Sequence, residues 1–225
     1  MEKGFLIVME GACDGIGKST QFKKLSTALK DSGYKVVSHH FPSYGTIGGA
    51  PVEEYLAGNF GDKAELSPYF INTLYATDRA CIWLTKLKKE YDKGKIILLD
   101  RYTTSSIIYQ SSLIPNWRDR KKFIDYVIDY EYNKIGIASP DMVVFLDAPF
   151  DLVTKQRKNR VDYEGNSSDI HEKDIEFMHK VYDNSRQIAK YLDWDIVECS
   201  ENDIMRTKDE IHEDILKKVL TKIKK

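Results

Sequence analysis

The sequence has few cysteines, no long apolar run and no clear excess of charge of either sign. Three cysteines, widely spaced and outside any metal-ligand pattern, argue against a disulfide framework or zinc site and predict free thiols in a reducing compartment. No apolar stretch approaches the about 20 residues that span a bilayer. Residues 1–4 run directly into the first apolar run, so we expect no signal peptide. These absences predict a cytoplasmic protein without a membrane segment.

Charge and chain length exclude further classes. The 34 basic and 35 acidic residues give a formal net charge of −1, which provides no general attraction to nucleic acid or to an anionic membrane. We therefore expect neither as a partner. No repeat, low-complexity tract or linker divides the 225 residues, which suffice for one α/β domain with a sizeable core. We predict a single domain over residues 1–225.

The stretch after residue 4 has the pattern of a phosphate-binding loop. Residues 5–9 are apolar, as in a buried strand of a parallel sheet, and a glycine-bearing loop from Gly11 to Gly17 follows. Lys18 then opens a segment with helical periodicity. Strand, glycine loop, Gly-Lys-Ser and helix together predict a P-loop, whose backbone N–H groups and helix N-terminus bind phosphate. The residues assigned to the nucleotide phosphates are Gly11, Asp14, Gly15, Gly17, Lys18, Ser19 and Thr20.

Within this loop, Lys18 is expected to reach the β- and γ-phosphates and the Ser19 hydroxyl to bind Mg²⁺. The spacing departs from the usual motif, because five residues rather than four separate Gly11 from Gly17. The position in strict register is Ala12. The loop is therefore either one residue longer than usual or starts on alanine.

The rest of the chain alternates predicted strands and helices, which indicates a doubly wound parallel sheet. Ligands of such sheets bind at the carboxyl ends of the strands. We predict further strands at residues 35–39, 95–101, 141–147 and 195–199, and helices over about 67–91, 103–110, 121–134, 150–160 and 173–192, with a last helix at the C-terminus.

Asp100 and Arg101 stand where the third predicted strand ends. A carboxylate there can hold Mg²⁺ or orient an attacking oxygen, and a guanidinium suits a second phosphate. The alternative is a surface ion pair. His39 and His40, at the end of the second predicted strand, are interpreted as solvated or hydrogen-bonded loop histidines.

Tyr75 and Arg79 are four residues apart on one predicted helix and share a face. A ring and a guanidinium on one face could stack on a planar base and hydrogen-bond its edge, or they could be a core aromatic with an arginine at its rim. Two further pairs at this spacing follow Asp100 and would offer polar groups to the same pocket: Ser105 with Tyr109, and Ser106 with Gln110.

A basic run that includes Arg157 and Arg160 precedes a polar Gly-Asn-Ser-Ser loop. It is either a solvated face or the start of a lid, over about residues 155–170, that closes on a nucleotide. The P-loop contains no arginine. A cation for the transferring phosphoryl must therefore come from elsewhere, which favours the lid.

In this order the motifs resemble those of the thymidylate kinase family over nearly the whole chain. They are Glu10-Gly11, Asp14-Gly15-x-Gly17-Lys18-Ser19-Thr20-Gln21, Phe41-Pro42, Tyr75-x-x-Asp78-Arg79, Asp100-Arg101-Tyr102, Ser105-Ser106, Tyr109-Gln110 and Leu146-Asp147. The resemblance implies a P-loop kinase fold with a five-stranded parallel sheet. It also implies transfer of the γ-phosphoryl of ATP to dTMP with Mg²⁺, and a homodimer.

The resemblance also implies roles for individual residues. Lys18 and Ser19 would hold the donor phosphates and Mg²⁺, Asp14 would lie near the acceptor sugar and phosphate, and Asp100 would serve Mg²⁺ or the reaction geometry. The expected acceptor-binding residues are Phe41, Pro42, Tyr44, Tyr75, Arg79, Arg101, Ser105, Ser106, Tyr109 and Gln110. Among them Tyr75 would stack on thymine, Arg79 would meet the base edge, Arg101 would hold the acceptor phosphate and Tyr109 would crowd the 2′ position. Arg157 and Arg160 would supply the lid cations.

One departure from the family pattern concerns the acceptor. The family usually reads Phe-Pro-x-Arg, and here Tyr44 occupies the arginine position. A lost charge-assisted hydrogen bond costs about 1.5–3 kcal/mol. The alternatives to a thymidylate kinase are therefore a kinase for another nucleoside monophosphate or a deoxynucleoside, and a nucleotide-binding switch protein without phosphoryl transfer.

Overall fold

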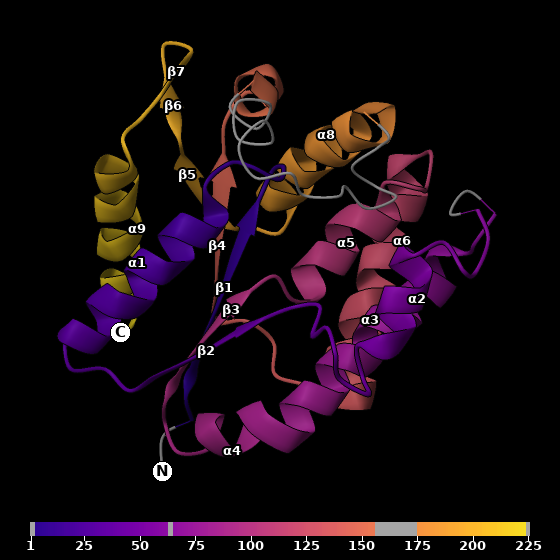
Figure 1. The fold of residues 1–225 in the computed structure, drawn as a ribbon, viewed down its shortest axis with the longest axis horizontal. Helices are drawn as coiled ribbons and strands as arrows, with labels where there is room; N and C mark the ends of the chain where they lie inside the picture. Colours follow the sequence, from indigo (N-terminus) through magenta and orange to yellow (C-terminus); the bar gives the residue numbers. More distant parts are fainter. Residues whose placement is uncertain (1–2, 63–64, 156–174, 224–225) are drawn as a thin grey trace.

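A computed structural model describes residues 3–62, 65–155 and 175–223. Its centre is a five-stranded parallel sheet with strand order β2-β3-β1-β4-β5 and helices on both faces (Figure 1). The strands are β1 (Phe5–Gly11), β2 (Val36–His40), β3 (Ile96–Asp100), β4 (Met142–Asp147) and β5 (Asp195–Glu198). The predicted fold class and all five predicted strands are confirmed.

The register of the sheet brings the carboxyl ends of β1, β2 and β3 to one edge. Asp100, the last residue of β3, is paired with Met9 on one side and with His40 on the other. β1 lies between β3 and β4, and β3 and β4 are buried along their whole length. This burial explains why the predicted central strands read as continuous apolar runs rather than as alternating ones.

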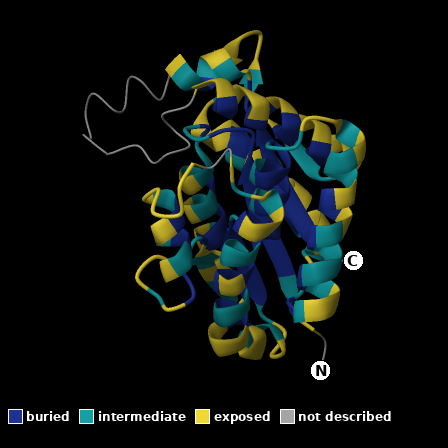
Figure 2. Ribbon diagram, turned by 90° about the vertical axis from the view of Figure 1, so that its right-hand side faces the viewer, coloured by how far each residue is buried: buried dark blue, intermediate teal, exposed yellow. Residues whose placement is uncertain are grey.

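Helices cover the sheet in two layers. α1 and α9 pack together on one side, while α3, α5 and α6 form a second group on the other (Figure 1). The helices are α1 (Lys18–Asp31), α2 (Ala50–Leu56), α3 (Pro68–Ile82), α4 (Lys88–Tyr91), α5 (Thr103–Ser111), α6 (Trp117–Ile128), α8 (Ile175–Tyr191) and α9 (Lys208–Ile223). The buried residues gather between these layers and the sheet (Figure 2). In the described parts of the chain, no helix is both long and apolar enough to cross a membrane.

Two predicted helices are not α-helical throughout. The helix expected over residues 67–91 is α-helical only to Ile82, continues as the π-helix η1 (Trp83–Leu87) and ends in α4. The helix expected over 121–134 likewise continues from α6 into the π-helix η2 (Asp129–Ile135). Apolar periodicity does not distinguish these two backbones, because a π-turn keeps the chain helical while it adds one residue per turn.

A small antiparallel hairpin was not predicted. β6 (Ser200–Glu201) and β7 (Ile204–Met205) pair after β5. Asn202 and Asp203, between the two strands, have φ values of 50° and 59°. Such a left-handed pair closes two-residue hairpins, and asparagine and aspartate tolerate it better than most residues.

Candidate active site

The loop between β1 and α1 lines a cavity of about 130 Å³. Its lining residues are Cys13, Asp14, Gly15, Gly17, Lys18, Ser19 and Thr20. Gly15 and Gly17 have φ values of 95° and 98°, which only glycine adopts readily. α1 begins at Lys18 with no side-chain cap and no acidic residue in its first turn. Its first N–H groups and its positive dipole end therefore suit an anion in this cavity.

Gly11 belongs to the strand rather than to the lining of the loop cavity. It is the last residue of β1, and the next backbone N–H, that of Ala12, donates to Leu146 O at 3.0 Å. The segment that turns away from the sheet therefore starts at Cys13. A Cβ at position 11 would lie 2.9 Å from Ile16 Cγ2, so this glycine permits close packing beneath the loop.

Lys18 and Asp100 form an ion pair between the phosphate loop and the end of β3. His40 Nδ1, at the end of β2, lies 3.3 Å from the second oxygen of Asp100. Burial raises the pKa of Asp100, but the hydrogen bond from His40 and the charge of Lys18 more than offset this and hold the pKa at about 2. Asp100 is therefore a carboxylate at neutral pH, next to the phosphate cavity.

Arg101 connects the phosphate loop to the neighbouring cavity. Its guanidinium forms an ion pair with Asp14 and lies over the Tyr109 ring, 5.4 Å from the ring centroid. Its Nη1 is 3.8 Å from Oε1 of Glu10, which is fully buried. Burial opposes the charge of Arg101, but Asp14 and its other neighbours raise its pKa well above the ordinary value. The arginine φ is 66°, an uncommon conformation of the kind that clusters at functional sites.

Glu10 also fixes the first turn of α5. The hydroxyls of Thr104 and Ser105 donate to Glu10 Oε2 at 2.9 and 2.6 Å. Sequence reasoning gave Glu10 no role of its own. Its signal in the sequence is weak, because a single acidic residue near the end of an apolar run has no partner at a defined spacing. In the structure it is a fully buried carboxyl group that faces Arg101.

The residues that could hold Mg²⁺ are Ser19 and Asp100. Mg²⁺ in phosphoryl-transfer sites takes one or two protein oxygens and completes its octahedron with substrate phosphates and water. Ser19 is exposed at the loop cavity, and Asp100 is an ionised carboxylate held by the loop lysine. Across the described ranges, no group of three or more His, Cys, Asp or Glu residues could hold a metal. This donor set fits an ion that arrives with nucleotide phosphates.

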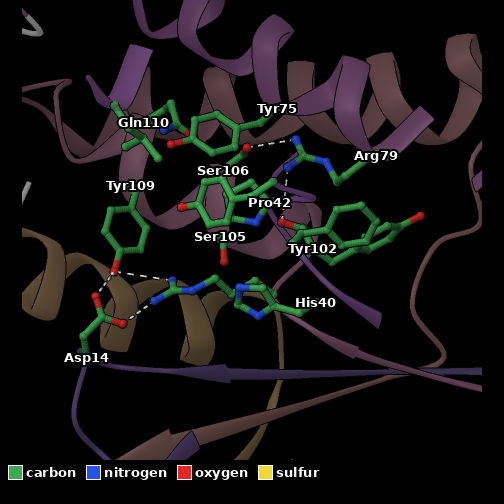
Figure 3. A pocket seen from close by; sticks show the side chains of 14 residues that line it. Asp14, His40, Pro42, Tyr75, Arg79, Tyr102, Ser105, Ser106, Tyr109 and Gln110 are labelled. Carbon is green, nitrogen blue, oxygen red and sulfur yellow. Dashed lines mark hydrogen bonds and ion pairs between the residues drawn. The ribbon is translucent and has the colours of Figure 1, made fainter. Parts of the chain in front are cut away.

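A second cavity, of about 250 Å³, adjoins the phosphate loop and shares Asp14 with it. All ten residues that the sequence assigned to the acceptor line it: Phe41, Pro42, Tyr44, Tyr75, Arg79, Arg101, Ser105, Ser106, Tyr109 and Gln110. Tyr75, Arg79 and Gln110 lie at one end, and Asp14 and His40 at the other (Figure 3). The cavity therefore has an aromatic and amide end and a charged end.

The aromatic and amide end holds a buried acceptor atom. Gln110 is 3% exposed, and its Oε1 has no hydrogen-bond partner among the described residues. Arg79 is 2% exposed, and its Nη2 donates to the Ser106 hydroxyl at 2.9 Å. Buried polar atoms are rarely left unpaired, so this end of the cavity suits a planar ligand with its own donors and acceptors.

Sequence reasoning missed three residues that line this cavity, His40, Leu56 and Tyr102. His40 was interpreted as a solvated or hydrogen-bonded loop histidine; it is hydrogen-bonded, but to Asp100 inside the site. Its position directly before Phe41-Pro42, at the end of a strand, was the available signal. Of the proposed lid, about residues 155–170, only residue 155 is described, as part of a helical segment that includes residues 150–155. Arg157 and Arg160 lie outside the described residues.

Comparison with known proteins agrees with this geometry. The family model described as Thymidylate kinase matches residues 9–215. A thymidylate kinase of Mycobacterium tuberculosis is 33% identical over 179 residues, which cover 78% of this chain and 81% of the relative. A probable thymidylate kinase of Pyrococcus abyssi is 29% identical over 215 residues, 95% of each chain.

Among solved structures, a thymidylate kinase from Candida albicans superposes with a TM-score of 0.71 at 24% identity. The match covers 97% of this chain and 92% of the solved one, and it supports the P-loop kinase fold. The match of the family model over most of the chain extends the likeness beyond fold alone. The chain is a kinase and belongs to the thymidylate kinase family.

Proposed function

We propose that the protein transfers the γ-phosphoryl of ATP to dTMP, giving ADP and dTDP. The observation that carries this proposal is the contact of the two cavities at Asp14, with Lys18, Asp100 and Arg101 at their junction. A kinase must hold a donor phosphate and an acceptor phosphate in line, and most of its catalysis is positioning and charge stabilisation. One phosphate-binding loop beside a base-sized cavity meets that requirement.

On the donor side, the loop N–H groups and the N-terminus of α1 bind the phosphates of ATP. Lys18 exchanges its ion pair with Asp100 for the β- and γ-phosphates, because a dianionic phosphate is the stronger partner. Ser19 and Asp100 are the residues that would hold Mg²⁺ arriving with ATP, and the ion would supply positive charge to these phosphates.

On the acceptor side, Arg101 binds the phosphate of dTMP from the charged end of the cavity. The Tyr75 ring stacks on the base, Gln110 Oε1 accepts the N–H of the thymine ring, and Arg79 donates to a carbonyl at the base edge. Tyr109, beside Asp14 and Arg101, lies against the sugar and favours deoxyribose. A binding protein that only switches shape has no need for this second cavity.

Product analysis tests the proposal. Purified protein is incubated with Mg-ATP and dTMP, and the nucleotides are separated by anion exchange. We expect ADP and dTDP in equal amounts. ADP without dTDP would indicate simple nucleotide hydrolysis and would contradict the proposal. Thymidine, which lacks the phosphate that Arg101 binds, is the control acceptor, and we expect no phosphorylation of it.

A further inference from the structure

A fully buried ion pair supports the base end of the acceptor cavity. Arg79, on α3, donates from Nε to Glu131 Oε2 at 2.6 Å and from Nη2 to Glu131 Oε1 at 2.7 Å. Glu131 lies on η2, and the two side chains are 2% and 0% exposed. Two parallel N–H···O bonds fix both the distance and the plane of a guanidinium.

Glu131 itself is held on several sides. The Thr103 hydroxyl donates to its Oε2 at 3.1 Å. Its backbone carbonyl accepts the N–H groups of Gly136 and Ile137 at 3.0 and 3.1 Å, where η2 ends. These bonds come from α5 and from the end of η2, so the carboxylate is fixed relative to the cavity wall before any ligand binds.

The remaining bonds of Arg79 leave one donor direction open. Nε donates to Glu131, and Nη2 donates to Glu131, to Ser106 and, at 3.4 Å, to Asn72 Oδ1. Nη1 makes one long bond of 3.4 Å to Tyr102 O. A guanidinium has five N–H groups, two of them on Nη1. Within the described chain, the second N–H of Nη1 has no acceptor, although Arg79 lines the cavity.

Packing alone does not explain the acid. Ile124 and Val127 on α6 are buried, and Glu131 continues the same face one turn later. An apolar residue there would avoid the desolvation cost, and replacing buried ion pairs by apolar groups is often neutral or stabilising. The carboxylate becomes useful when the buried charge of Arg79 must be balanced and its guanidinium held in one orientation at a cavity wall. The charge of Glu131 outweighs burial and raises the pKa of Arg79.

We propose that Glu131 is a positioning residue for base recognition: it orients Arg79 so that Nη1 donates only to a carbonyl at position 4 of a pyrimidine. This inference rests on the proposed function. Arginine has no acceptor atom, so an amino group at that position would leave two donors facing each other. Loss of Glu131 therefore weakens discrimination between a keto and an amino pyrimidine, and not only the affinity.

The test uses dTMP and 5-methyl-dCMP, which share the methyl group, sugar and phosphate and differ at position 4 and in the proton on the neighbouring ring nitrogen. Gln110 meets the ring nitrogen in every protein compared, so a change in the ratio between proteins reports on the position-4 contact of Arg79. Glu131→Gln keeps the side-chain size but removes the charge, and Glu131→Asp keeps the charge but draws Arg79 back by one methylene. Glu176→Gln, which alters an exposed ion pair with Lys180, is the matched control. For each protein, kcat/KM for both nucleotides is measured together with the melting temperature, and calorimetry gives their affinities.

We expect the ratio of kcat/KM for dTMP to that for 5-methyl-dCMP to fall at least about tenfold in both Glu131 variants, through KM more than kcat, and to stay constant in the control. An unchanged ratio in folded Glu131 variants would overturn the inference. Failure of both conservative variants to fold would also overturn it, because a purely structural pair would then account for the contacts. A wild-type protein without dTMP phosphorylation would instead refute the proposed function.

Discussion

Replacement of Arg101 by alanine is the perturbation for which the structure predicts the largest effect on the acceptor. The side chain forms an ion pair with Asp14, faces Glu10 at 3.8 Å and covers the Tyr109 ring. The variant therefore loses the cation proposed for the acceptor phosphate. It also leaves Asp14 and the fully buried Glu10 without the guanidinium that lies between them and the incoming phosphate.

The magnitude follows from these two effects. A charge-assisted hydrogen bond is worth about 1.5–3 kcal/mol, and a buried carboxylate without its partner adds a cost of similar size. We expect a loss of about 3–6 kcal/mol in transition-state stabilisation, or about 10²–10⁴-fold in kcat/KM for dTMP. Arg101→Lys restores the charge but not the fork geometry, so we expect it to lie between alanine and wild type.

The assay follows ADP release with Mg-ATP and varied dTMP, and thymidine binding is measured by calorimetry. We expect the affinity for dTMP to fall and that for thymidine to change little, since thymidine lacks the phosphate. Arg118→Ala, at an exposed position on α6, is the control. Wild-type kcat/KM for dTMP in a folded Arg101→Ala protein would refute the assignment of this arginine to the acceptor phosphate.

Three further outcomes follow from the site. Lys18→Met is expected to lower kcat more than 10³-fold while the dTMP affinity measured by calorimetry stays near the wild-type value. A loss of dTMP affinity as large as the loss in kcat would contradict a donor-side role for Lys18. Chelation of divalent cations with EDTA is expected to abolish turnover without altering dTMP affinity, and activity that survives EDTA would argue against the assignment of Mg²⁺ to Ser19. Burial, with the charges of Lys86 and His40, lowers the pKa of His39 from 6.5 to about 4. The unfolded chain therefore protonates first, and the free energy of unfolding is highest above pH 6.5 and falls toward pH 4, by about 2 kcal/mol after allowance for partial exposure. Urea titrations at pH 7, 5.5 and 4 check this, and an equally steep loss in His39→Gln would show that another group is responsible.

The sequence predicted the sheet and most of the residues that line the acceptor cavity, and two physical reasons account for this. Parallel strands place their carboxyl ends at one edge, so residues that follow β1, β2 and β3 must converge. Asp14, Phe41 and Arg101 are far apart in the chain but line one cavity on this account. Residues four apart on a helix share a face. The pairs Tyr75 with Arg79 and Ser106 with Gln110 could therefore be predicted to line the same cavity.

Sequence was insufficient where a side chain depends on a partner far along the chain. Arg79 was placed at the base edge, but its ion pair with Glu131, 52 residues away, leaves no trace in local spacing. The π-helical segments η1 and η2 could not be predicted either, because the apolar pattern of the sequence continues through them unchanged. His40 was missed because a histidine at a strand end has no preferred partner until β3 supplies Asp100.

Initial rates over a panel of acceptors decide whether dTMP is the acceptor of this kinase. Wild-type protein with Mg-ATP is assayed for ADP release with dTMP, dUMP, dCMP, UMP, AMP and thymidine. We predict that dTMP has the highest kcat/KM, that dCMP is poor because it carries an amino group at position 4, and that thymidine is inactive. A higher kcat/KM for another acceptor, or ADP release that does not depend on any acceptor, would contradict the account.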